Sequence, residues 1–428
     1  MRPISGRFSV PGDKSISHRY AMLAALADGR SRIHGLAPGQ DVRSTLSCLQ
    51  TLGVAVTFAG ARDSRPGTEP GSRPFVEIEG AGLGGLRLPS ATLDAGNSGT
   101  TMRLLAGILA GHAFRSTLEG DGSLSKRPME RIAAPLRRMG ATVDTTGGHA
   151  PITITGGPLR PIVHESTVAS AQIKSAVLLA GLHAGGRTSV VEPAASRDHT
   201  ERALRAFGVT VEASPGYAAL DGHQRLEGRE LTVPGDPSSA AAWAAAAGSV
   251  PGSAIAIENV GLNPGRIGFV RALEQAGLDI RIELSHEAAG EPVGTVYVAY
   301  GAPSYFEIAP ADVPSLIDEL PVLAAMSARR GGMRVTGAKE LRVKESDRIR
   351  EIVSGLRALG AGADELEDGF TISPATMRAA SVDARDDHRL AMAFAIAALG
   401  TGRSHIEGAS VVDVSYPGFL DLLAARTS

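Results

Sequence analysis

The sequence predicts a mixed α/β protein of two domains, each built from three repeated units. Three observations support this prediction. The chain has 428 residues, which is more than one hydrophobic core usually accommodates. Alanine-rich segments and amphipathic segments alternate along it with a period of about 70 residues. One stretch near the N-terminus is also repeated in the middle of the chain.

The alanine-rich segments are the first element of each unit. They carry few charges, which is typical of a helix buried on nearly all sides, and each closes on a glycine expected to cap its C-terminus. The segments are AMLAALADG, RLLAGILAG, KSAVLLAGLHAGG, AAWAAAAGSVPG, LPVLAAMSARRGG and AMAFAIAALGTG. Their closing glycines are Gly29, Gly111, Gly185, Gly252, Gly331 and Gly400.

The amphipathic segments are the second element. Each predicts an amphipathic helix, a glycine stop and then a β-strand. They read LQTLGVAV, LRRMGATV, LRAFGVTV, LEQAGLDI and LRALGAGA, and the sixth copy is missing or degenerate near the C-terminus. Two Pro/Gly-rich stretches between these elements, 61–74 and 285–294, are predicted to be loops without chemistry.

The repeated stretch groups the units into two halves. FSVPGDKSISHRYAMLAALADG (8–29) resembles LTVPGDPSSAAAWAAAAGSVPG (231–252), three units further along. This spacing predicts a discontinuous domain of residues 1–12 and 236–428, containing both termini, and an inserted domain of residues 13–235.

Composition argues against several classes of protein. A formal net charge of −2 gives no global basic excess, so we expect no nucleic-acid partner and only local anion sites. No stretch reaches the roughly 18 apolar residues of a membrane span, and MRPISGRFSV lacks the apolar core of a secretory signal. The single cysteine, Cys48, allows no internal disulfide, and the histidines lack metal-ligand spacing. We therefore expect a cytoplasmic protein with no membrane association and no metal site.

The stretch PGDKSISHR, at 11–19, carries more polar residues than a turn requires. Pro11-Gly12-Asp13 suffices for the turn, so Lys14, Ser15 and Arg19 should lie in the first turns of a helix. Free N–H groups and the helix dipole favour an anion there, and the two cations strengthen that preference. The alternative is a capped helix with a solvated basic end.

Similar clusters stand at other predicted helix starts. Asn97 and Gly99 lie in DAGNSGTTMR, and Arg127 lies in DGSLSKRPME, ahead of a proline suited to a first helical turn. VASAQIKSAV and SRDHTERAL supply Ser170, Ala171, Gln172, Ser196 and Arg197. Plain capping or an exposed basic loop would explain each of these clusters taken alone.

Carboxylates join the cations in the second half. LRVKESDRIREI places Lys344, Glu345 and Arg348 together, with Lys344 and Arg348 at i,i+4 and therefore expected on one helix face. Asp318 precedes a helix too apolar to be a solvated surface, and Arg389 opens the sixth alanine-rich helix. A carboxylate among cations suits acid–base chemistry on an anionic substrate. We expect these helix starts to line one cleft that binds multiply charged anions.

The quoted motifs resemble a known family. PGDKSISHR, GNSGTTMR, SLSKRPM, ASAQIKSAVLLAG, RVKESDR and DDHRLAM are similar, in order and over nearly the whole chain, to 3-phosphoshikimate 1-carboxyvinyltransferases, also called 5-enolpyruvylshikimate-3-phosphate synthases. The resemblance implies a two-domain inside-out α/β barrel with three βαβαββ units per domain and an active site in the cleft between the domains. It implies transfer of the enolpyruvyl group of phosphoenolpyruvate to the 5-hydroxyl of shikimate 3-phosphate, with no cofactor, in a monomeric enzyme inhibited by glyphosate.

The resemblance also implies roles for individual residues. Asp318 would act as base or orienter for the 5-hydroxyl, and Glu345 would protonate the methylene carbon; Lys14 would touch both substrates. Shikimate 3-phosphate would be bound by Lys14, Ser15, Arg19, Ser170, Ala171, Gln172, Ser196 or Arg197, and Lys344. Phosphoenolpyruvate would be held by Lys14, Gly99, Arg127, Arg348 and Arg389, and Asn97 would also bind substrate.

Two departures and two rivals remain. Part of the family has an arginine where Ser123 stands and some members have a lysine where Val414 stands. A UDP-N-acetylglucosamine enolpyruvyltransferase would need a reactive loop cysteine, which Cys48 does not resemble. A non-catalytic polyanion-binding protein would gain nothing from Asp318 and Glu345.

Overall fold

The computed structural model describes residues 1–59 and 74–427. By its contacts the chain divides into two compact units. The terminal unit comprises Met1–Pro11, Gly235–His286 and Pro292–Ser428, and the central unit comprises Gly12–Pro234 and Glu287–Glu291. The sequence placed the domain boundaries at residues 12/13 and 235/236. Residues 61–73 of the first predicted loop lie outside the described residues.

The central unit contains three repeats with one strand order. The first repeat consists of α1 (Lys14–Leu26), β2 (Asp28–His34), α2 (Gln40–Thr51), β3 (Ala55–Ala59) and β4 (Phe75–Ala81), with β13 (Glu230–Thr232) added. The second consists of β5 (Leu93–Asp94), α3 (Gly99–Leu109), β6 (Arg115–Glu119), η1 (Leu124–Lys126), α4 (Glu130–Met139), β7 (Thr142–Thr146) and β8 (His149–Thr155). The third consists of β9 (Val163–Glu165), α5 (Ala171–Gly181), β10 (Arg187–Val191), α6 (His199–Ala206), β11 (Val211–Ser214) and β12 (Tyr217–Asp221).

The terminal unit repeats the pattern with N-terminal strand β1 (Ser5–Ser9) in its first sheet. That repeat continues with α7 (Pro237–Ser249), β14 (Ala254–Gly261), α8 (Gly268–Gln275), β15 (Asp279–Ala288) and β16 (Glu291–Ala299). The next contains β17 (Phe306–Ile308), η2 (Val313–Ser315), α9 (Leu320–Arg329), β18 (Met333–Val335), η3 (Lys339–Val343), α10 (Arg348–Ala358), β19 (Gly362–Leu366) and β20 (Gly369–Ser373). The last contains β21 (Ser381–Asp383), α11 (His388–Ala397), β22 (His405–Glu407), η4 (Ala409–Val414) and α12 (Phe419–Thr427).

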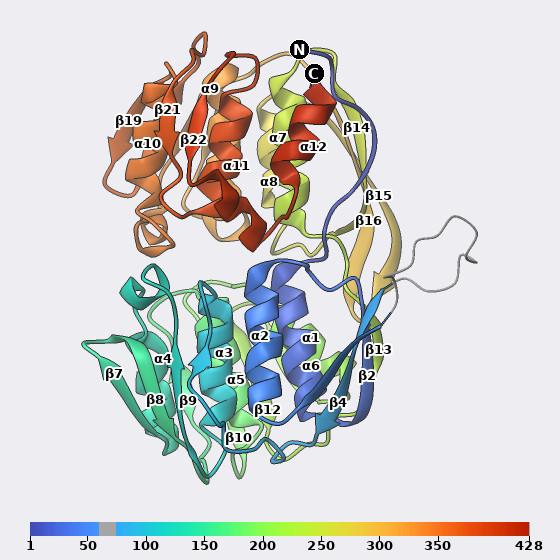
Figure 1. Ribbon diagram of the computed structural model, residues 1–428, viewed down its shortest axis with the longest axis vertical. Coiled ribbons are helices and arrows are strands. Elements are labelled where there is room, and N and C mark those ends of the chain that lie inside the picture. Colours follow the sequence, from blue (N-terminus) through green and yellow to red (C-terminus); the bar gives the residue numbers. More distant parts are fainter. Residues whose placement is uncertain (60–73, 428) are drawn as a thin grey trace. The chain divides into compact units, whose positions relative to one another are not determined.

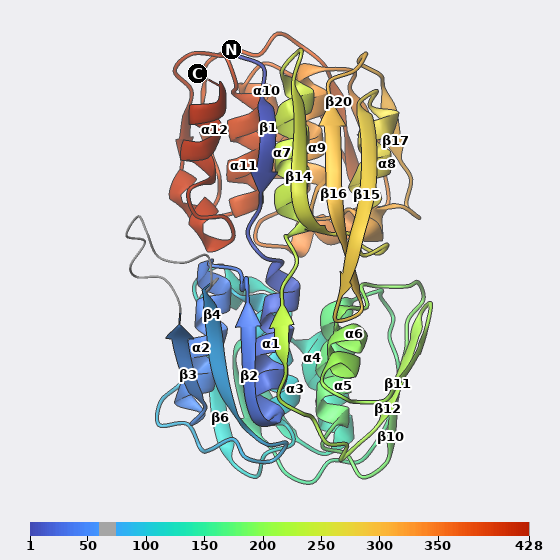
Figure 2. The same ribbon diagram turned by 90° about the vertical axis from the view of Figure 1, so that its right-hand side faces the viewer.

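The second and third repeats of the central unit and the second repeat of the terminal unit are continuous βαβαββ segments, whereas the first repeat of each unit takes its parallel edge strand, β13 or β1, from elsewhere in the chain. In β5-β6-β8-β7, for example, β5 pairs parallel with β6, and β8 pairs antiparallel with both β6 and β7. The sheet β1-β14-β16-β15 follows the same order, and Figure 2 shows these strands side by side. The sixth unit departs from the expected βαβαββ pattern. Its described residues form only the two-stranded sheet β21-β22.

The alanine-rich helices form the core of each unit. In the central unit α3 packs against α5 and α1, and Figure 1 shows α3 beside α5. In the terminal unit α7, α9 and α11 contact one another, and every residue of α7 is buried. Small side chains make this possible, because a Cβ at Gly107 of α3 would lie 2.3 Å from the carbonyl oxygen of Ala176 on α5. The sheets and amphipathic helices cover this core.

The sequence predicted a glycine stop for both kinds of helix, and the structure bears this out much better for the amphipathic helices than for the alanine-rich ones. All five amphipathic helices have the expected glycine stop with positive φ, from Gly277 at 85° to Gly140 at 114°. Among the alanine-rich helices, α9 has its predicted glycine stop, because Gly331 follows the cap residue Arg330 with a φ of 71°. The glycine caps predicted for the other five are wrong, since none of these helices has its predicted glycine in positive φ directly after the cap residue. Helix α1, for example, is capped by Ala27, and Gly29 lies in strand β2.

The second predicted loop, 285–294, is instead the hairpin of β15 and β16. Its two-residue turn, Ala289 and Gly290, has φ of 50° and 82°, as a tight hairpin turn requires. Alternation of polar and small residues masked these strands in the sequence. No helix among the described residues is both long and apolar enough to cross a membrane.

Candidate active site

Lys14 opens helix α1 in the central unit, as predicted. Asp13 caps the helix by accepting a hydrogen bond from the Ile16 amide at 2.8 Å. The Lys14 ammonium forms an ion pair with Asp41 at 2.8 Å, and Asp41 opens helix α2. The backbone carbonyl of Asp41 also accepts a bond from Thr101 of α3 at 3.3 Å. Asp41 therefore links the starts of α1, α2 and α3.

Arg19 is buried one turn further along α1 and is held mainly by neutral groups. Its guanidinium donates to the hydroxyl of Thr200 at 2.6 Å, to the hydroxyl of Ser175 at 2.8 Å and to the carbonyl of Ser15 at 2.8 Å. Burial lowers the pKa of Arg19 to about 10, against the opposing effect of Glu201. The charge is thus fixed in orientation but only weakly compensated, as an anion-binding arginine would be.

The start of α3 brings three predicted residues together. Arg127 donates to the side-chain oxygen of Asn97 at 2.6 Å and to the hydroxyl of Ser123 at 3.3 Å. A Cβ at Gly99 would lie 3.3 Å from the Arg127 guanidinium and 2.7 Å from that of Arg103. Arg127 thus contacts Ser123, the position at which part of the resembling family has an arginine. The helix after Pro128 begins only at Glu130, so this proline is not in a first helical turn as predicted.

Helix α5 begins as the sequence predicts, with Ser170 as its cap and Ala171 and Gln172 in its first turn. The Gln172 side chain accepts from Arg103 at 2.6 Å and donates to Thr100 at 3.0 Å. These bonds join the starts of α3 and α5.

Ser196 and Arg197 precede α6 but do not cap it. The cap residue of α6 is Asp198, and no side-chain bond closes the turn. The Ser196 hydroxyl donates instead to Glu192 at 2.7 Å. The capping alternative for this motif is therefore wrong, and the hydroxyl has another partner.

The terminal unit gathers the predicted carboxylates around Arg348. This side chain is 1% exposed and donates to Asp387 at 2.7 and 3.1 Å and to Glu345 at 2.6 Å, and it lies 3.5 Å from Asp318. Burial alone would lower its pKa, but Asp387, Glu345 and Asp318 together raise it. Arg348 is thus a permanent cation that fixes three carboxylates.

Lys344 also lies close to Asp318, but not for the reason that the sequence suggested. Helix α10 begins only at Arg348, and Lys344 follows the short helix η3, so the two residues do not share a helix face. Each nevertheless lies 3.5 Å from the same oxygen of Asp318. The bend at 344–346, and not helical periodicity, produces this convergence.

Arg389 opens α11, as predicted, and lies 3.9 Å from the fully buried Glu319. Glu319 also accepts a hydrogen bond from Ser238 of α7 and lies 3.8 Å from Arg266. The second oxygen of Glu319 has no hydrogen-bond partner among the described residues. Val414, at the end of η4, places no charge in this part of the unit.

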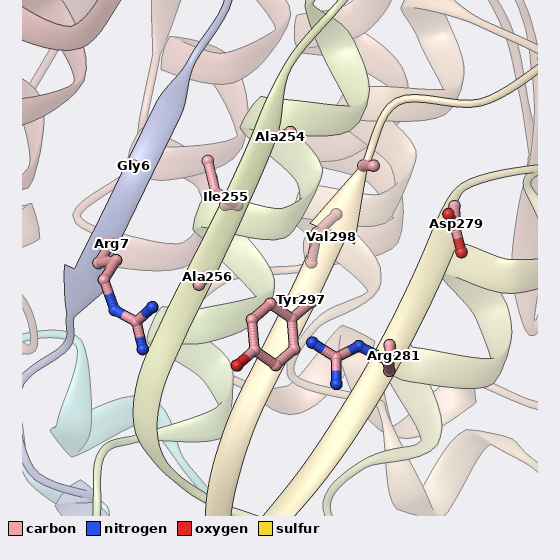
Figure 3. A pocket seen from close by; sticks show the side chains of 10 residues that line it. Gly6, Arg7, Ala254, Ile255, Ala256, Asp279, Arg281, Tyr297 and Val298 are labelled. Atoms are coloured by element: carbon pink, nitrogen blue, oxygen red, sulfur yellow. The ribbon is translucent and has the colours of Figure 1, made fainter.

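A hollow on the outer face of the sheet β1-β14-β16-β15 contains none of the predicted site residues. Figure 3 shows Arg281 beside the ring of Tyr297, 3.9 Å from its centroid. Arg7, which also lines the hollow, is paired with Glu258 at 2.6 Å. Both arginines of the hollow already have partners, so we do not place the anion site there.

Cys48 cannot be the reactive cysteine of the rival transferase. It is buried on α2, and its thiol donates to the carbonyl of Asp94 at 3.3 Å. Burial raises the pKa of the thiol to about 12, so no thiolate forms near neutral pH. No cluster of potential metal ligands occurs in residues 1–59 and 74–427 either.

Sequence reasoning missed the partners that hold the predicted cations. Asp41, Thr200 and Asp387 each bind a site cation, yet Asp41 and Thr200 look like ordinary residues of a first helical turn. The aspartate pair in RDDHR was the only local signal, and it did not distinguish Asp387 from its neighbour.

The fold and these clusters define an α/β protein of repeated units that displays cations and carboxylates at helix starts, as expected of an enzyme acting on anionic substrates. The family model described as EPSP synthase (3-phosphoshikimate 1-carboxyvinyltransferase) matches residues 1–423, and the chain belongs to this family.

Individual relatives agree with this assignment. The 3-phosphoshikimate 1-carboxyvinyltransferase of Acidithiobacillus ferrooxidans is 48% identical over 418 residues, covering 97% of this chain and 94% of the relative. That of Brevibacillus brevis is 45% identical over 427 residues, covering 99% and 97%. The solved structure of EPSP synthase from Acinetobacter baumannii matches with a TM-score of 0.84 and 41% identity, covering 100% of this chain and 96% of that one.

Proposed function

We infer that the chain transfers the enolpyruvyl group of phosphoenolpyruvate to the 5-hydroxyl of shikimate 3-phosphate and releases phosphate. This is the enolpyruvyl-transfer step of aromatic amino-acid biosynthesis. The observation that carries the inference is the family match over residues 1–423. The two clusters support it, because both substrates are polyanions and the reaction needs proton transfer.

The chemistry is assigned to the terminal unit. Asp318 takes or orients the proton of the 5-hydroxyl while the hydroxyl oxygen adds to C2 of phosphoenolpyruvate. Glu345 delivers a proton to the methylene carbon. The resulting tetrahedral adduct then loses phosphate from C2 and a proton from the methyl carbon, which Glu345 helps to remove. Support for these roles comes from Arg348, which contacts both carboxylates.

Binding is assigned to both units. Lys14, with Ser15, Arg19 and the α5 start, holds shikimate 3-phosphate, and Lys344 contacts its hydroxyl region. Lys14, Gly99, Arg127, Arg348 and Arg389 hold phosphoenolpyruvate. The bond from Asn97 to Arg127 supports a fixed guanidinium there. Arg348 already contacts carboxylates with its nitrogens, which favours orientation of Asp318 and Glu345 as a second part of its role.

Further features of the resemblance remain proposals. We propose that the two units are the two domains of an inside-out α/β barrel, with the alanine-rich helices as its interior. We propose that the enzyme is a cytoplasmic monomer and that glyphosate competes with phosphoenolpyruvate. Gly99 supports inhibitor binding, because a glycine leaves the space before Arg103 and Arg127 open.

The experiment is a phosphate-release assay with shikimate 3-phosphate and phosphoenolpyruvate. Turnover should require both substrates and should yield 5-enolpyruvylshikimate 3-phosphate by mass spectrometry. Binding of both without phosphate release would make the chain a polyanion-binding protein, and turnover only with UDP-N-acetylglucosamine as acceptor would support the rival transferase.

A further inference from the structure

A second charged group is buried in the central unit beside the start of α5 and has no place in the roles above. Lys174, 4% exposed on α5, forms ion pairs with Glu192 at 3.0 Å and Glu201 at 2.9 Å. Both carboxylates are also buried. Two buried carboxylates around one lysine are costly, so the arrangement calls for an explanation beyond stability.

Glu192 contacts two segments assigned to shikimate 3-phosphate. One of its oxygens accepts from the Ser170 amide at 2.8 Å, at the cap position of α5. The other accepts from the Ser196 hydroxyl at 2.7 Å, in the turn that carries Arg197. A single carboxylate thus fixes the start of α5 and the turn before α6 relative to each other.

The bond from Ser196 distinguishes two predicted ligands. A hydroxyl has one proton, and that of Ser196 is donated to Glu192. In this arrangement Ser196 cannot also donate to a phosphate oxygen, whereas Arg197, the next residue, carries a cation suited to one. The alternative left open by the sequence, Ser196 or Arg197, is thereby narrowed to Arg197.

A carboxylate close to an anion site would repel the ligand unless its charge were compensated. Lys174 supplies that compensation, and it also lies 3.5 Å from the Ser196 carbonyl. Burial lowers the pKa of Lys174, but Glu201 and Glu192 outweigh it and raise the pKa. The other charged or titratable groups that face the cluster are Arg19 on α1, Arg197 before α6 and His164 on β9.

We propose that Glu192 is a positioning residue for shikimate 3-phosphate: neutralised by Lys174, it holds the Ser170 cap and the Ser196–Arg197 turn in the binding geometry. The proposal rests on the proposed function, since it takes shikimate 3-phosphate as the ligand of these segments. A solely stabilising ion-pair cluster would leave substrate affinity unchanged in a folded variant.

Glu192→Gln tests this proposal because the two effects of the change have opposite signs. Removing a negative charge near an anion site should tighten binding if the charge alone matters. Glutamine, however, offers one acceptor oxygen where glutamate offers two, so one segment loses its anchor. We expect the dissociation constant of shikimate 3-phosphate, by calorimetry, to rise about tenfold, with the KM for phosphoenolpyruvate unchanged. Affinity equal to or tighter than that of the unmodified protein would overturn the proposal.

Ser196→Ala provides a double-mutant cycle with Glu192→Gln. If Ser196 acts through Glu192, the double variant should bind shikimate 3-phosphate much as the weaker single variant does, and additive losses would contradict this.

Lys174→Met tests the compensation of charge. Without the lysine, the Glu192 carboxylate lies uncompensated close to the anion site and repels the phosphate of the substrate. The dissociation constant of shikimate 3-phosphate should therefore rise more than tenfold relative to the unmodified protein, with the KM for phosphoenolpyruvate unchanged. An unchanged dissociation constant would count against the charge role of Lys174.

Lys174→Arg should keep the affinity, and the exposed Lys126→Met serves as the matched control. If Lys174→Met does not fold, the proposal is still decided by Glu192→Gln and by its double-mutant cycle with Ser196→Ala. Turnover of the unmodified protein separates the outcomes: its absence would refute the proposed function, whereas turnover with an unaffected Glu192→Gln refutes only this inference.

Discussion

Arg19, in the second turn of α1, and Arg348, at the start of α10, are both buried arginines, but their surroundings are opposite. Arg19 donates to two hydroxyls and a carbonyl, and burial lowers its pKa to about 10. Arg348 contacts three carboxylates, which raise its pKa.

The difference indicates two functional roles for a buried arginine. A guanidinium held by neutral partners keeps its charge available for an incoming anion. One surrounded by carboxylates also fixes those carboxylates for proton transfer, in addition to any anion that it binds. Each role can be tested by substituting the arginine or one of the residues that it contacts.

The largest effect is expected from Glu345→Gln in the terminal unit. It removes proton transfer while leaving every cation in place, so kcat should fall by roughly 10²- to 10⁴-fold with little change in the affinity for shikimate 3-phosphate. Steady-state kinetics and calorimetry measure the two quantities. The exposed Glu340→Gln, in the same segment, should behave as the unmodified enzyme, and an intact kcat for Glu345→Gln would remove Glu345 from the chemistry.

Asp387→Asn should come next, as a loss of stability. Asp387 is fully buried, caps α11 and binds Arg348 through both oxygens. Asparagine can keep the cap but not the charge, and breaking a buried pair costs about 3–5 kcal/mol. Urea unfolding followed by the signal of Trp243, in the terminal unit, would measure this. A midpoint unchanged by the substitution would mean that Arg348 is well compensated by Glu345 and Asp318 alone.

Arg19→Ala should weaken shikimate 3-phosphate binding by about 2–4 kcal/mol, the scale for losing one partner of a charged pair. Because its partners are hydroxyls and a carbonyl, the protein itself should lose less stability than with Asp387→Asn. Calorimetric titration gives the affinity, and Arg43→Ala, exposed on α2, is the control. If Arg19→Ala bound the substrate normally, the contrast between the two arginines would lose its functional meaning.

The smallest effect is expected from Gly99→Ala. An added Cβ would meet the Arg103 and Arg127 guanidiniums at 2.7 and 3.3 Å, so both must shift. Glyphosate is longer than phosphoenolpyruvate, so we expect it to bind more weakly, with an inhibition constant raised about tenfold. The KM for phosphoenolpyruvate should rise less. Gly84→Ala, with no atom within 4 Å of the added Cβ, is the matched control. Equal changes for inhibitor and substrate, or tolerance in the unmodified enzyme, would show that other features shape the pocket.

The sequence predicted those parts of the fold and site that depend on local signals. Capping residues and turn chemistry placed Lys14 and Ser170 at helix starts, and alanine-rich composition located the buried helices. Contacts between distant segments left no such signal: Thr200 meets Arg19 across 181 positions, and Asp387 meets Arg348 across 39. The i,i+4 argument for Lys344 and Arg348 failed because a bend precedes α10, and spacing describes a helix face only inside a helix.

Strand β1 has a consequence for the order of folding during synthesis. Ser5–Ser9 pairs in parallel with Ala254–Glu258, so β1 is made long before its partner strand. By the time β14 is made, Gly12–Pro234 already exists and can begin to fold on its own contacts, without Glu287–Glu291. We therefore expect the central unit to fold first and the terminal unit to wait for a long loop to close. A ribosome-bound chain stalled before β14 would hold an unpaired β1, whose backbone groups could pair with another chain.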